Sequence, residues 1–172
     1  MPTPTQTFDV IVAGGGISGT VAAIAAAREG ASVLLVERYA ALGGMATLGL
    51  VQPITTWGIA GQYVIGGTGR RLLEEMIERR PGSATPMGHY GPSCDAEHLK
   101  RMLEETALEH GVRLLYHAWI AGVEAEGEEL RAIRIVSKSG EDLLRARAVV
   151  DATGDGDVAA FAGVPCEVGS QG

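Results

Sequence analysis

The sequence predicts an α/β fold, built on a doubly wound, mostly parallel β-sheet with an antiparallel three-stranded β-meander as one crossover. Short β-branched apolar runs alternate with helical stretches, which is typical of a parallel sheet with both faces covered. A glycine-rich turn joins the first of these runs to the first helix. Three later runs are separated by Glu/Gly and Ser/Gly clusters and partly alternate in polarity, which indicates hairpins.

Length and composition are those of a single globular unit. The chain has 172 residues, of which 46% are hydrophobic and 20% charged. These values predict one domain that spans residues 1–172, and they exclude long disorder. The net charge of −7, without a basic run, argues against nonspecific nucleic-acid binding. Glycine supplies 25 residues, about twice its average share of roughly 7%, and it clusters in a few segments.

Cysteine usage and apolar patterning point to the cytoplasm. Cys94 and Cys166 are far apart and form no CxxC pair, so the sequence predicts two reduced thiols. The first positively charged side chain is Arg28, which predicts no signal peptide. The longest apolar stretch, around residues 21–27, is too short to cross a bilayer. We therefore expect a cytoplasmic protein without a membrane partner.

The N-terminal part of the chain has the pattern of a β-turn-α-β unit. Residues 8–13 form an apolar, β-branched run that predicts a buried strand. Residues 20–29 are rich in alanine and are followed by Gly30, which indicates a helix with a glycine stop. A second buried strand is expected over residues 32–36, ending at Glu37.

The middle of the chain contains loops, two helices and a third strand. Residues 42–69 are glycine-rich and lack a clean period, so we expect loops and short turns there. Apolar spacing over residues 70–80 predicts an amphipathic helix. Asp95 has the position of an N-cap for a helix that runs to His110. Residues 112–116 predict a third buried strand.

The C-terminal part predicts the meander and a return to the parallel sheet. The meander strands are expected at residues 119–126, 130–137 and 142–147. The last of them continues into a buried strand over 148–151, and a short helix is expected at 158–162. The parallel strands should lie in the order 3-2-1-4. They are expected near residues 9–13, 32–36, 112–117 and 148–151.

Gly14-x-Gly16-x-x-Gly19 has the spacing of a dinucleotide fingerprint. It follows a predicted strand, opens a helix, and precedes the acid Glu37 by 23 residues counted from Gly14. Gly14 suits a tight turn, Gly16 a close backbone approach to a pyrophosphate, and Gly19 tight packing of helix on strand. The carboxylate of Glu37 can accept hydrogen bonds from both ribose hydroxyls and disfavours the 2′-phosphate of NADP, although the adjacent Arg38 weakens that preference. The alternative is a glycine-rich turn that holds no ligand.

A second glycine-rich segment and a late turn complete an ordered set of motifs. The set consists of Asp9–Gly16, Val36–Arg38, Gly43–Thr47 and the run Asp151-Ala-Thr-Gly-Asp-Gly-Asp157. In this order the motifs resemble the FAD-dependent oxidoreductase family, which has the glutathione-reductase-like, Rossmann-like FAD-binding fold. The resemblance is closest to its fumarate-reductase-like and glucose-inhibited-division-protein-like branch, and it extends from Asp9 to about Val168.

The resemblance implies that FAD is the cofactor. It implies that Gly14 to Gly19 hold the pyrophosphate, that the backbone at Ile120 binds adenine, and that Asp157 binds ribitol or phosphate directly or through water. A further group would lie near the pyrophosphate, ribitol and flavin, namely Gly44, Met45 and Thr47. The cofactor-binding positions implied in this way are Gly14, Gly16, Ile17, Ser18, Gly19, Glu37, Arg38, Gly44, Met45, Thr47, Ile120, Ala152, Thr153, Gly154 and Asp157.

The chain departs from the family in length. Family members carry a substrate domain and a C-terminal segment that adds another parallel strand, so this chain resembles their N-terminal part or a minimal relative. The resemblance implies a small-molecule substrate and leaves room for NAD(P)H or another electron partner, but it names no catalytic acid or base and no metal. Without the added strand, residues 148–151 would form an exposed sheet edge through which a homo-oligomer could form.

Other functions and other residues remain as alternatives. One is a tRNA-modification-type flavoprotein, for which the pairs Arg70-Arg71 and Arg79-Arg80 could contact RNA. Another is a nucleotide-binding module without catalysis. The pair His89-Tyr90 falls in a predicted loop that would face a substrate, whereas no second cysteine is close to Cys94 in sequence, and Cys94 is expected to be a plain thiol. The two carboxylates Asp155 and Asp157 are expected to cap the following helix rather than to bind a metal.

Overall fold

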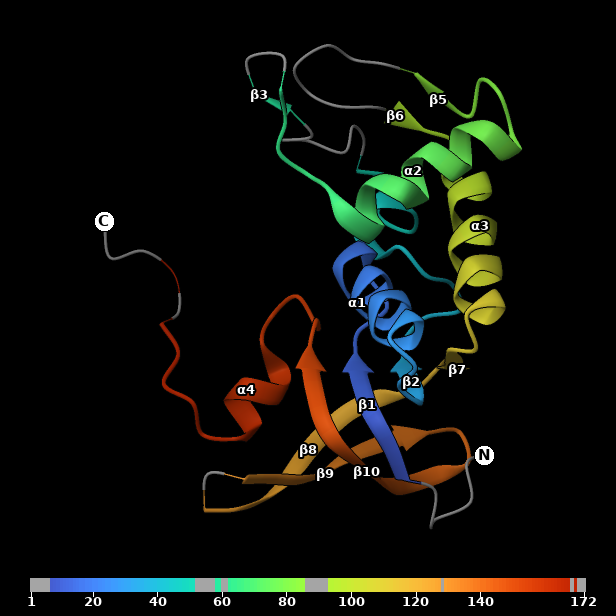
Figure 1. Ribbon diagram of the computed structural model, residues 1–172. Helices are drawn as coiled ribbons and strands as arrows, with labels where there is room; N and C mark the ends of the chain where they lie inside the picture. Colours follow the sequence, from blue (N-terminus) through green and yellow to red (C-terminus); the bar gives the residue numbers. More distant parts are fainter. Residues whose placement is uncertain are drawn as a thin grey trace.

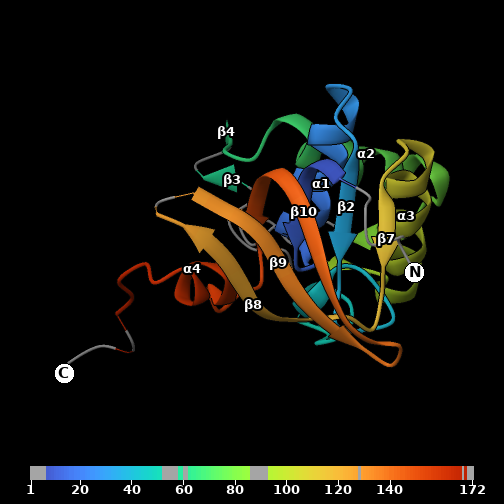
Figure 2. The same ribbon diagram turned by 90° about the horizontal axis from the view of Figure 1, so that it is seen from below.

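The computed structural model describes residues 7–51, 58–59, 62–85, 93–127, 129–167 and 169. Its centre is a six-stranded sheet in the order β7-β2-β1-β10-β9-β8. Helices α1, α2 and α3 lie on one side of the parallel strands, and the meander strands lie on the other side (Figures 1 and 2). The expected α/β class with a meander crossover is confirmed.

Four strands run parallel at the core of the sheet. They are β1 (Thr7–Ala13), β2 (Val33–Val36), β7 (Arg113–Leu115) and the second half of β10 (Gly140–Asp151). β1 pairs in parallel with β2 on one side and with β10 on the other, and β2 pairs in parallel with β7. The predicted strand order 3-2-1-4 is therefore confirmed.

The meander and the fourth parallel strand share one long strand. β8 (Trp119–Glu126) pairs antiparallel with β9 (Glu129–Ser137), and β9 pairs antiparallel with residues 140–144 of β10. Residues 145–151 of β10 then pair with β1 alone among the described strands. The outer edge of this last segment has no strand partner in the described part of the chain, as expected for residues 148–151.

The helices begin and end close to their predicted positions. The four are α1 (Ile17–Arg28), α2 (Gly67–Arg79), α3 (Ala96–Glu109) and α4 (Asp157–Phe161). Asp95 caps α3 as predicted, because its side chain accepts a hydrogen bond from the main-chain N–H of His98 at 3.0 Å. α1 and α2 each begin three residues earlier than predicted, since glycines in their first turns did not prevent helix formation.

Short elements occupy the glycine-rich region and the loop before α3. A 3₁₀ turn, η1, covers Gly44–Ala46. Two small hairpins follow, formed by β3 (Gly58–Ile59) with β4 (Gln62–Tyr63) and by β5 (Ala84–Thr85) with β6 (Ser93–Cys94). No helix in the described ranges is long and apolar enough to span a bilayer.

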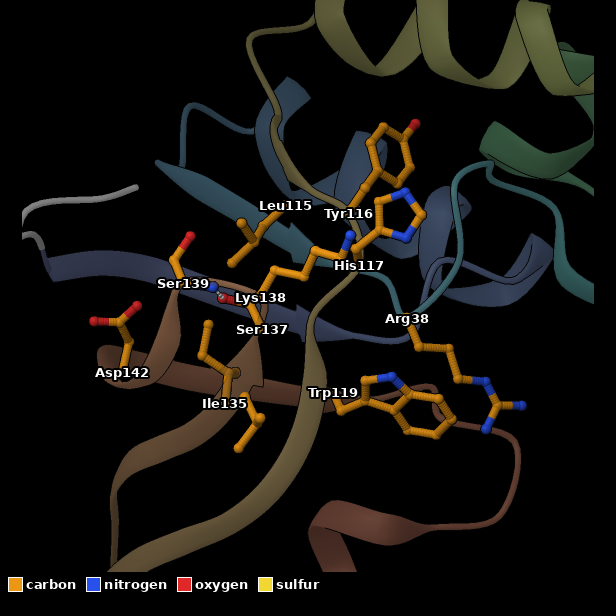
Figure 3. Close-up of a pocket in the computed structure, with 11 residues that line it drawn as sticks. Arg38, Leu115, Tyr116, His117, Trp119, Ile135, Ser137, Lys138, Ser139 and Asp142 are labelled. Atoms are coloured by element: carbon orange, nitrogen blue, oxygen red, sulfur yellow. Dashed lines mark hydrogen bonds between the residues drawn. The ribbon is translucent and has the colours of Figure 1, made fainter.

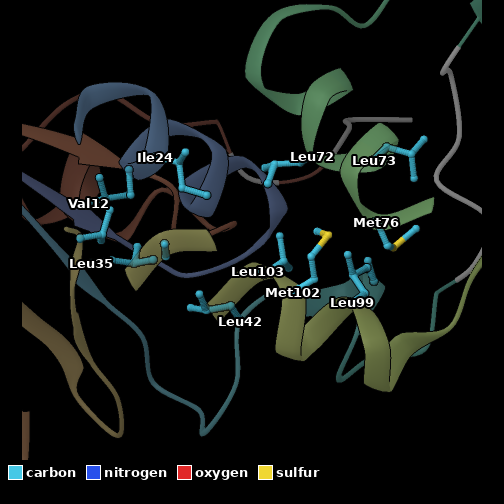
Figure 4. Close-up of a cluster of buried hydrophobic side chains, with 14 of the residues drawn as sticks. Val12, Ile24, Leu35, Leu42, Leu72, Leu73, Met76, Leu99, Met102 and Leu103 are labelled. Carbon is cyan, nitrogen blue, oxygen red and sulfur yellow. The ribbon is translucent and has the colours of Figure 1, made fainter. Parts of the chain in front are cut away.

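Alternate residues of the parallel strands feed two apolar cores on opposite faces. Val12, Val33 and Leu35 face the helices and pack with residues such as Met102 and Leu103 of α3 (Figure 4). The other face packs against the meander, where Phe8, Ile11, Leu34, Val36, Ala118, Ile133, Ile135 and Leu144 form the second core. This alternation explains why the strands appear as continuous apolar runs in the sequence.

Candidate functional site

The glycine-rich turn begins at the carboxyl end of β1. Gly14 has a φ of +100°, which L side chains rarely adopt, and its N–H donates a 2.8 Å hydrogen bond to the carbonyl of Val36. A Cβ atom on Gly14 would overlap the carbonyl oxygen of Ala152. Glycine is therefore required here by both conformation and space, as the sequence predicted for the tight turn.

Gly19 lies at the contact between α1 and the strands. A Cβ atom on Gly19 would overlap the carbonyl oxygen of Gly14 and would lie 3.0 Å from the Cβ of Ala152. Real Cβ atoms do not tolerate the first contact, because the opposing atom belongs to the backbone and cannot rotate away. The predicted packing role of Gly19 is confirmed by this geometry.

Gly16 is the position at which the turn opens outward. It is the N-cap of α1 with φ −62° and ψ −180°, and an added Cβ would meet no atom within 4 Å. No side chain caps this helix end, and its first turn contains no acidic residue. The first N–H groups of α1, including those of Ile17 and Ser18, have no intrahelical acceptor, and together with the helix dipole they favour an anion there.

The second glycine segment lies directly against the first. The N–H of Gly43 donates a 2.8 Å hydrogen bond to the carbonyl of Gly15, and Gly16 and Gly43 form a parallel bridge. A Cβ on Gly44 would lie 3.1 Å from the Cα of Gly16. Two chain segments about 30 residues apart thus form one cradle of backbone groups, which we call the glycine cradle and define as Gly14–Gly16 with Gly43–Gly44.

Met45 lies within η1 and Thr47 directly follows it, and their side chains differ in exposure. The side chain of Met45 is exposed. Thr47 is fully buried, and its hydroxyl donates a 2.6 Å hydrogen bond to the carbonyl of Leu42. In this structure the Thr47 hydroxyl therefore stabilises the turn from inside, and the exposed Met45 is the one of the two whose side chain is available to a ligand.

Glu37, at the end of β2, is buried and holds the cradle. Its side-chain Oε2 accepts a 2.7 Å hydrogen bond from the N–H of Gly15, and Oε1 accepts one of 2.8 Å from the N–H of Tyr39. Each carboxylate oxygen has a second lone pair, so the acid can still accept from a ribose hydroxyl. The link from Glu37 to Gly15 was not predicted, because sequence spacing does not show which turn amide an acid will meet.

Arg38 lies beside Trp119, the residue before Ile120. The guanidinium of Arg38 lies 5.0 Å from the ring centre of Tyr39 and 5.4 Å from that of Trp119. Trp119 precedes Ile120 in β8, so the structure brings the residue after Glu37 to the strand that was expected to bind adenine. The Arg38 charge is held over two aromatic rings, a favourable cation–π arrangement.

The turn after β10 lies against Gly14 of the glycine cradle. The N–H of Ala152 donates a 2.8 Å hydrogen bond to the carbonyl of Ala13, and Gly154 has a φ of +90°. Thr153 Cα would lie 3.0 Å from a Cβ on Gly14. Asp157 begins α4. The structure therefore brings the early glycine turn and this late turn together, as expected from the resemblance.

A hollow of about 750 Å³, which the sequence analysis did not predict, lies beside Arg38 and Trp119 (Figure 3). None of its lining residues belongs to the glycine cradle. The other lining residues come from the end of β7 and from the β9–β10 hairpin, namely Leu115, Tyr116, His117, Ile135, Val136, Ser137, Lys138, Ser139 and Asp142.

The other candidates from the sequence are a His-Tyr pair, two cysteines and possible metal ligands. His89 and Tyr90 lie outside the residues that the structure describes. Cys94 and Cys166 form no disulfide, and burial raises the pKa of Cys94 to about 11, in keeping with a plain thiol. Among the described residues, no group of three or more His, Cys, Asp or Glu side chains could hold a metal ion.

Gly15 and Gly43 lie in the two predicted glycine motifs, but neither is among the individual cofactor-binding positions given above. A Cβ on Gly15 would lie 2.7 Å from Leu42 Cδ2 and 2.9 Å from Glu37 Oε2. Gly43 has a φ of +99°, and its Cβ would overlap the side chain of Thr47. The only signal in the sequence was the glycine runs themselves, which do not distinguish a residue that binds from one that allows close packing.

The parallel sheet, the uncapped helix end at Gly16 and the buried acid after β2 are features that the Rossmann-like dinucleotide-binding folds share. The sequence model of the FAD dependent oxidoreductases matches residues 9–172. The chain belongs to this family, and FAD is the cofactor that the family indicates. The residues present fit it, because the cradle offers backbone N–H groups and open space at Gly16.

Curated relatives agree with this assignment. The chain is 30% identical over 154 residues to the tRNA uridine 5-carboxymethylaminomethyl modification enzyme MnmG of Chlorobium phaeovibrioides, covering 83% of this chain and 24% of that protein. It is 26% identical over 175 residues to digeranylgeranylglycerophospholipid reductase 2 of Methanococcoides burtonii, covering 94% of this chain and 41% of that protein. The chain thus spans less than half the length of these relatives.

Solved structures show the same fold. The flavin-dependent brominase Bmp2 aligns with a TM-score of 0.69 at 20% identity, over 92% of this chain and 41% of that chain. L-proline dehydrogenase from P. horikoshii aligns with a TM-score of 0.67 at 16% identity, over 95% of this chain and 58% of that chain. At these identities the likeness establishes the fold.

Proposed function

We propose that this chain is the FAD-binding part of an oxidoreductase in which the flavin transfers a hydride or electrons to or from a small molecule. The observation that carries the proposal is the open N-terminus of α1. Gly16 leaves free space there, no side chain caps the helix, and the backbone of Gly43 and Gly44 lies opposite. A pyrophosphate is the ligand group that such a cradle suits best.

Each proposed contact uses a group that the chain positions in advance. The N–H groups of Ile17, Ser18 and Gly19 would bind the pyrophosphate, together with the backbone at Gly16. The carboxylate of Glu37 would accept from the adenosine ribose. The other proposed cofactor-binding positions are those implied by the resemblance, namely Gly14, Arg38, Gly44, Met45, Thr47, Ile120, Ala152, Thr153, Gly154 and Asp157.

When bound, the flavin supplies the redox chemistry, and the protein supplies binding and orientation. We assign no catalytic acid or base to this chain. The substrate and the electron partner, whether NAD(P)H or another molecule, would meet the flavin at the Met45 end of the cradle, away from Glu37. A cytoplasmic location would keep both thiols, Cys94 and Cys166, reduced, in keeping with the lack of a disulfide between them.

The buried carboxylate of Glu37 favours FAD over NADP. A 2′-phosphate placed at the ribose would bring a second negative charge to a side chain that is only 6% exposed. The nearest positive charge that could offset it belongs to Arg38, whose guanidinium is held over Tyr39 and Trp119. Calorimetric titration of the chain with FAD and with NADP tests this preference, and tighter binding of NADP would overturn it.

A tRNA-modification function is the second candidate, because two MnmG proteins are 30% and 31% identical to this chain. Three of the four arginines that suggested RNA contact form ion pairs with carboxylates. Arg70 pairs with Glu74 at 2.7 Å, Arg79 with Glu109 at 2.9 Å, and Arg80 with Asp95 at 3.3 Å. These contacts reduce the positive potential of that surface, so they weigh against RNA binding there.

Two simple measurements separate the candidates. Binding of tRNA at moderate salt, measured by filter retention, would support the second candidate over a small-molecule oxidoreductase. A purified chain that shows no flavin absorbance and does not change the spectrum of added FAD would support a nucleotide-binding module without catalysis. Our proposal expects a perturbed flavin spectrum and no tRNA retention.

A further inference from the structure

One carboxylate organises the turn that follows β10. Asp151 is the last residue of that strand. Its Oδ1 accepts hydrogen bonds from the N–H of Thr153 at 3.1 Å and from the Thr153 hydroxyl at 2.7 Å, and its Oδ2 accepts one from the N–H of Ala159 at 2.9 Å. The side chain therefore joins the end of the strand, the middle of the turn and the first turn of α4.

The hydroxyl of Thr153 extends this network. While it donates to Asp151, it accepts a 2.9 Å hydrogen bond from the N–H of Asp157, the first residue of α4. Asp151 and Thr153 thus satisfy two N–H groups at the start of a five-residue helix that its N-cap, Gly156, has no side chain to cap. A helix this short depends on such partners for its position.

The same turn is in contact with the glycine cradle. The carbonyl of Ala152 and the Cα of Thr153 leave no room for a Cβ on Gly14, and the N–H of Ala152 extends the pairing of β10 with β1 by bonding Ala13. A displacement of the turn would therefore either move Gly14 or open a gap beside it. Ala152 and Thr153 therefore link Asp151 to Gly14 of the cradle.

We propose that Asp151 is a positioning residue for the FAD site, whose carboxylate fixes the turn 152–156 against Gly14 and so sets the affinity for the dinucleotide. This inference rests on the proposed function. Asp151 acts through the turn rather than by touching the cofactor. It is distinct from the carboxylates at 155 and 157, which lie in the turn and in α4 themselves.

The ionisation of Asp151 agrees with this role. Partial burial acts to raise its pKa, but hydrogen bonds from the Ala159 N–H and from the hydroxyl and N–H of Thr153 lower it more, and the net pKa lies below the usual value. An asparagine at this position has only one acceptor oxygen, and its amide nitrogen cannot accept from Ala159. The Asp151→Asn variant therefore removes part of the network with almost no change in shape.

The experiment compares Asp151→Asn with the matched control Asp155→Asn, which removes the same charge four residues away and none of these hydrogen bonds. We expect Asp151→Asn to raise the dissociation constant for FAD about tenfold or more, and Asp155→Asn to change it less than about twofold. Amide hydrogen exchange at Ala159, measured without FAD, should become faster in Asp151→Asn alone. Thr153→Val, which removes the hydroxyl bonded to Asp151 and to the N–H of Asp157, should also weaken FAD binding and speed amide exchange at Asp157.

Two results would overturn the inference. One is an Asp151→Asn chain that keeps wild-type FAD affinity, and the other is an equal loss in Asp151→Asn and Asp155→Asn. If Asp151→Asn does not fold, Thr153→Val takes its place, and either wild-type FAD affinity or an FAD loss without faster amide exchange at Asp157 would overturn the inference. Failure of the proposed function is distinguishable, because then the wild-type chain itself binds no FAD, while the exchange of Ala159 still reports whether Asp151 holds the turn.

Discussion

The main-chain N–H of Gly15 donates a 2.7 Å hydrogen bond to Oε2 of Glu37, across 22 positions of sequence. The acid that follows β2 thus fixes the glycine turn that follows β1. The other oxygen, Oε1, is bonded to the N–H of Tyr39. Glu37 is therefore part of the structural frame of the cradle as well as the proposed contact for the adenosine ribose.

Replacing Glu37 by glutamine should affect both stability and cofactor choice. The amide nitrogen must face the N–H of Gly15 or of Tyr39, so one buried donor loses its acceptor, which costs about 1–3 kcal/mol of unfolding free energy. Loss of the charge should also narrow the gap between FAD and NADP affinity. Urea unfolding and calorimetric titration measure the two effects. Glu29→Gln, at the exposed end of α1, is the control, and equal behaviour of the two variants would contradict the assignment.

Gly16→Val should abolish FAD binding while the chain stays folded. The backbone at Gly16 suits any residue, and an added Cβ meets no protein atom, so the fold has room for the side chain. The valine methyls would instead occupy the space proposed for the pyrophosphate. Circular dichroism and FAD titration are to be measured on the same sample. Unchanged affinity in a folded variant would show that this turn does not hold phosphate.

Gly19→Ala, unlike Gly16→Val, should destabilise the fold. Its Cβ would overlap the carbonyl oxygen of Gly14, so the helix must move away from the strand. We expect the fold itself to lose about 1–3 kcal/mol, the cost of an overpacked contact. Thermal unfolding should thus separate the two glycines, with a lower midpoint for Gly19→Ala than for Gly16→Val.

Cys94 should be inert towards thiol reagents in the folded chain. Its side chain is buried and its pKa is raised to about 11, so the reactive thiolate is scarce until the pH approaches that value. Cys166 is exposed. At pH 8 a disulfide reagent should label one thiol per native chain and two per unfolded chain. Native Cys166→Ser should then give no label, and fast labelling of this variant would contradict the burial of Cys94.

The open edge of β10 predicts self-association. Residues 145–151 pair only with β1 among the described strands, and Val150 is 36% exposed. Unpaired edge groups invite pairing with another chain, and a lysine on the edge opposes it. Light scattering over a concentration series should show a dimer or a higher oligomer that Val150→Lys weakens. A wild-type chain that stays monomeric at every concentration would show that this edge does not pair with a second chain.

Local pattern was enough to predict the sheet, but not the contacts between distant turns. Parallel strands buried on both faces gave apolar runs such as 33–36, and the order 3-2-1-4 was expected for a doubly wound sheet built from them. The start of α1 was placed too late, because helix propensity disfavours Gly19 whereas tertiary packing requires a glycine there. The bond from Gly15 to Glu37 and the network of Asp151 depend on distances that no spacing in the sequence specifies.

The central claim is that the glycine cradle binds FAD, and the visible difference spectrum of the chain mixed with FAD tests it most directly. We predict a shifted and resolved flavin band with saturation at one FAD per chain, and no change for Gly16→Val under the same conditions. A wild-type chain that leaves the flavin spectrum unchanged at every concentration, although circular dichroism shows it folded, would contradict the claim.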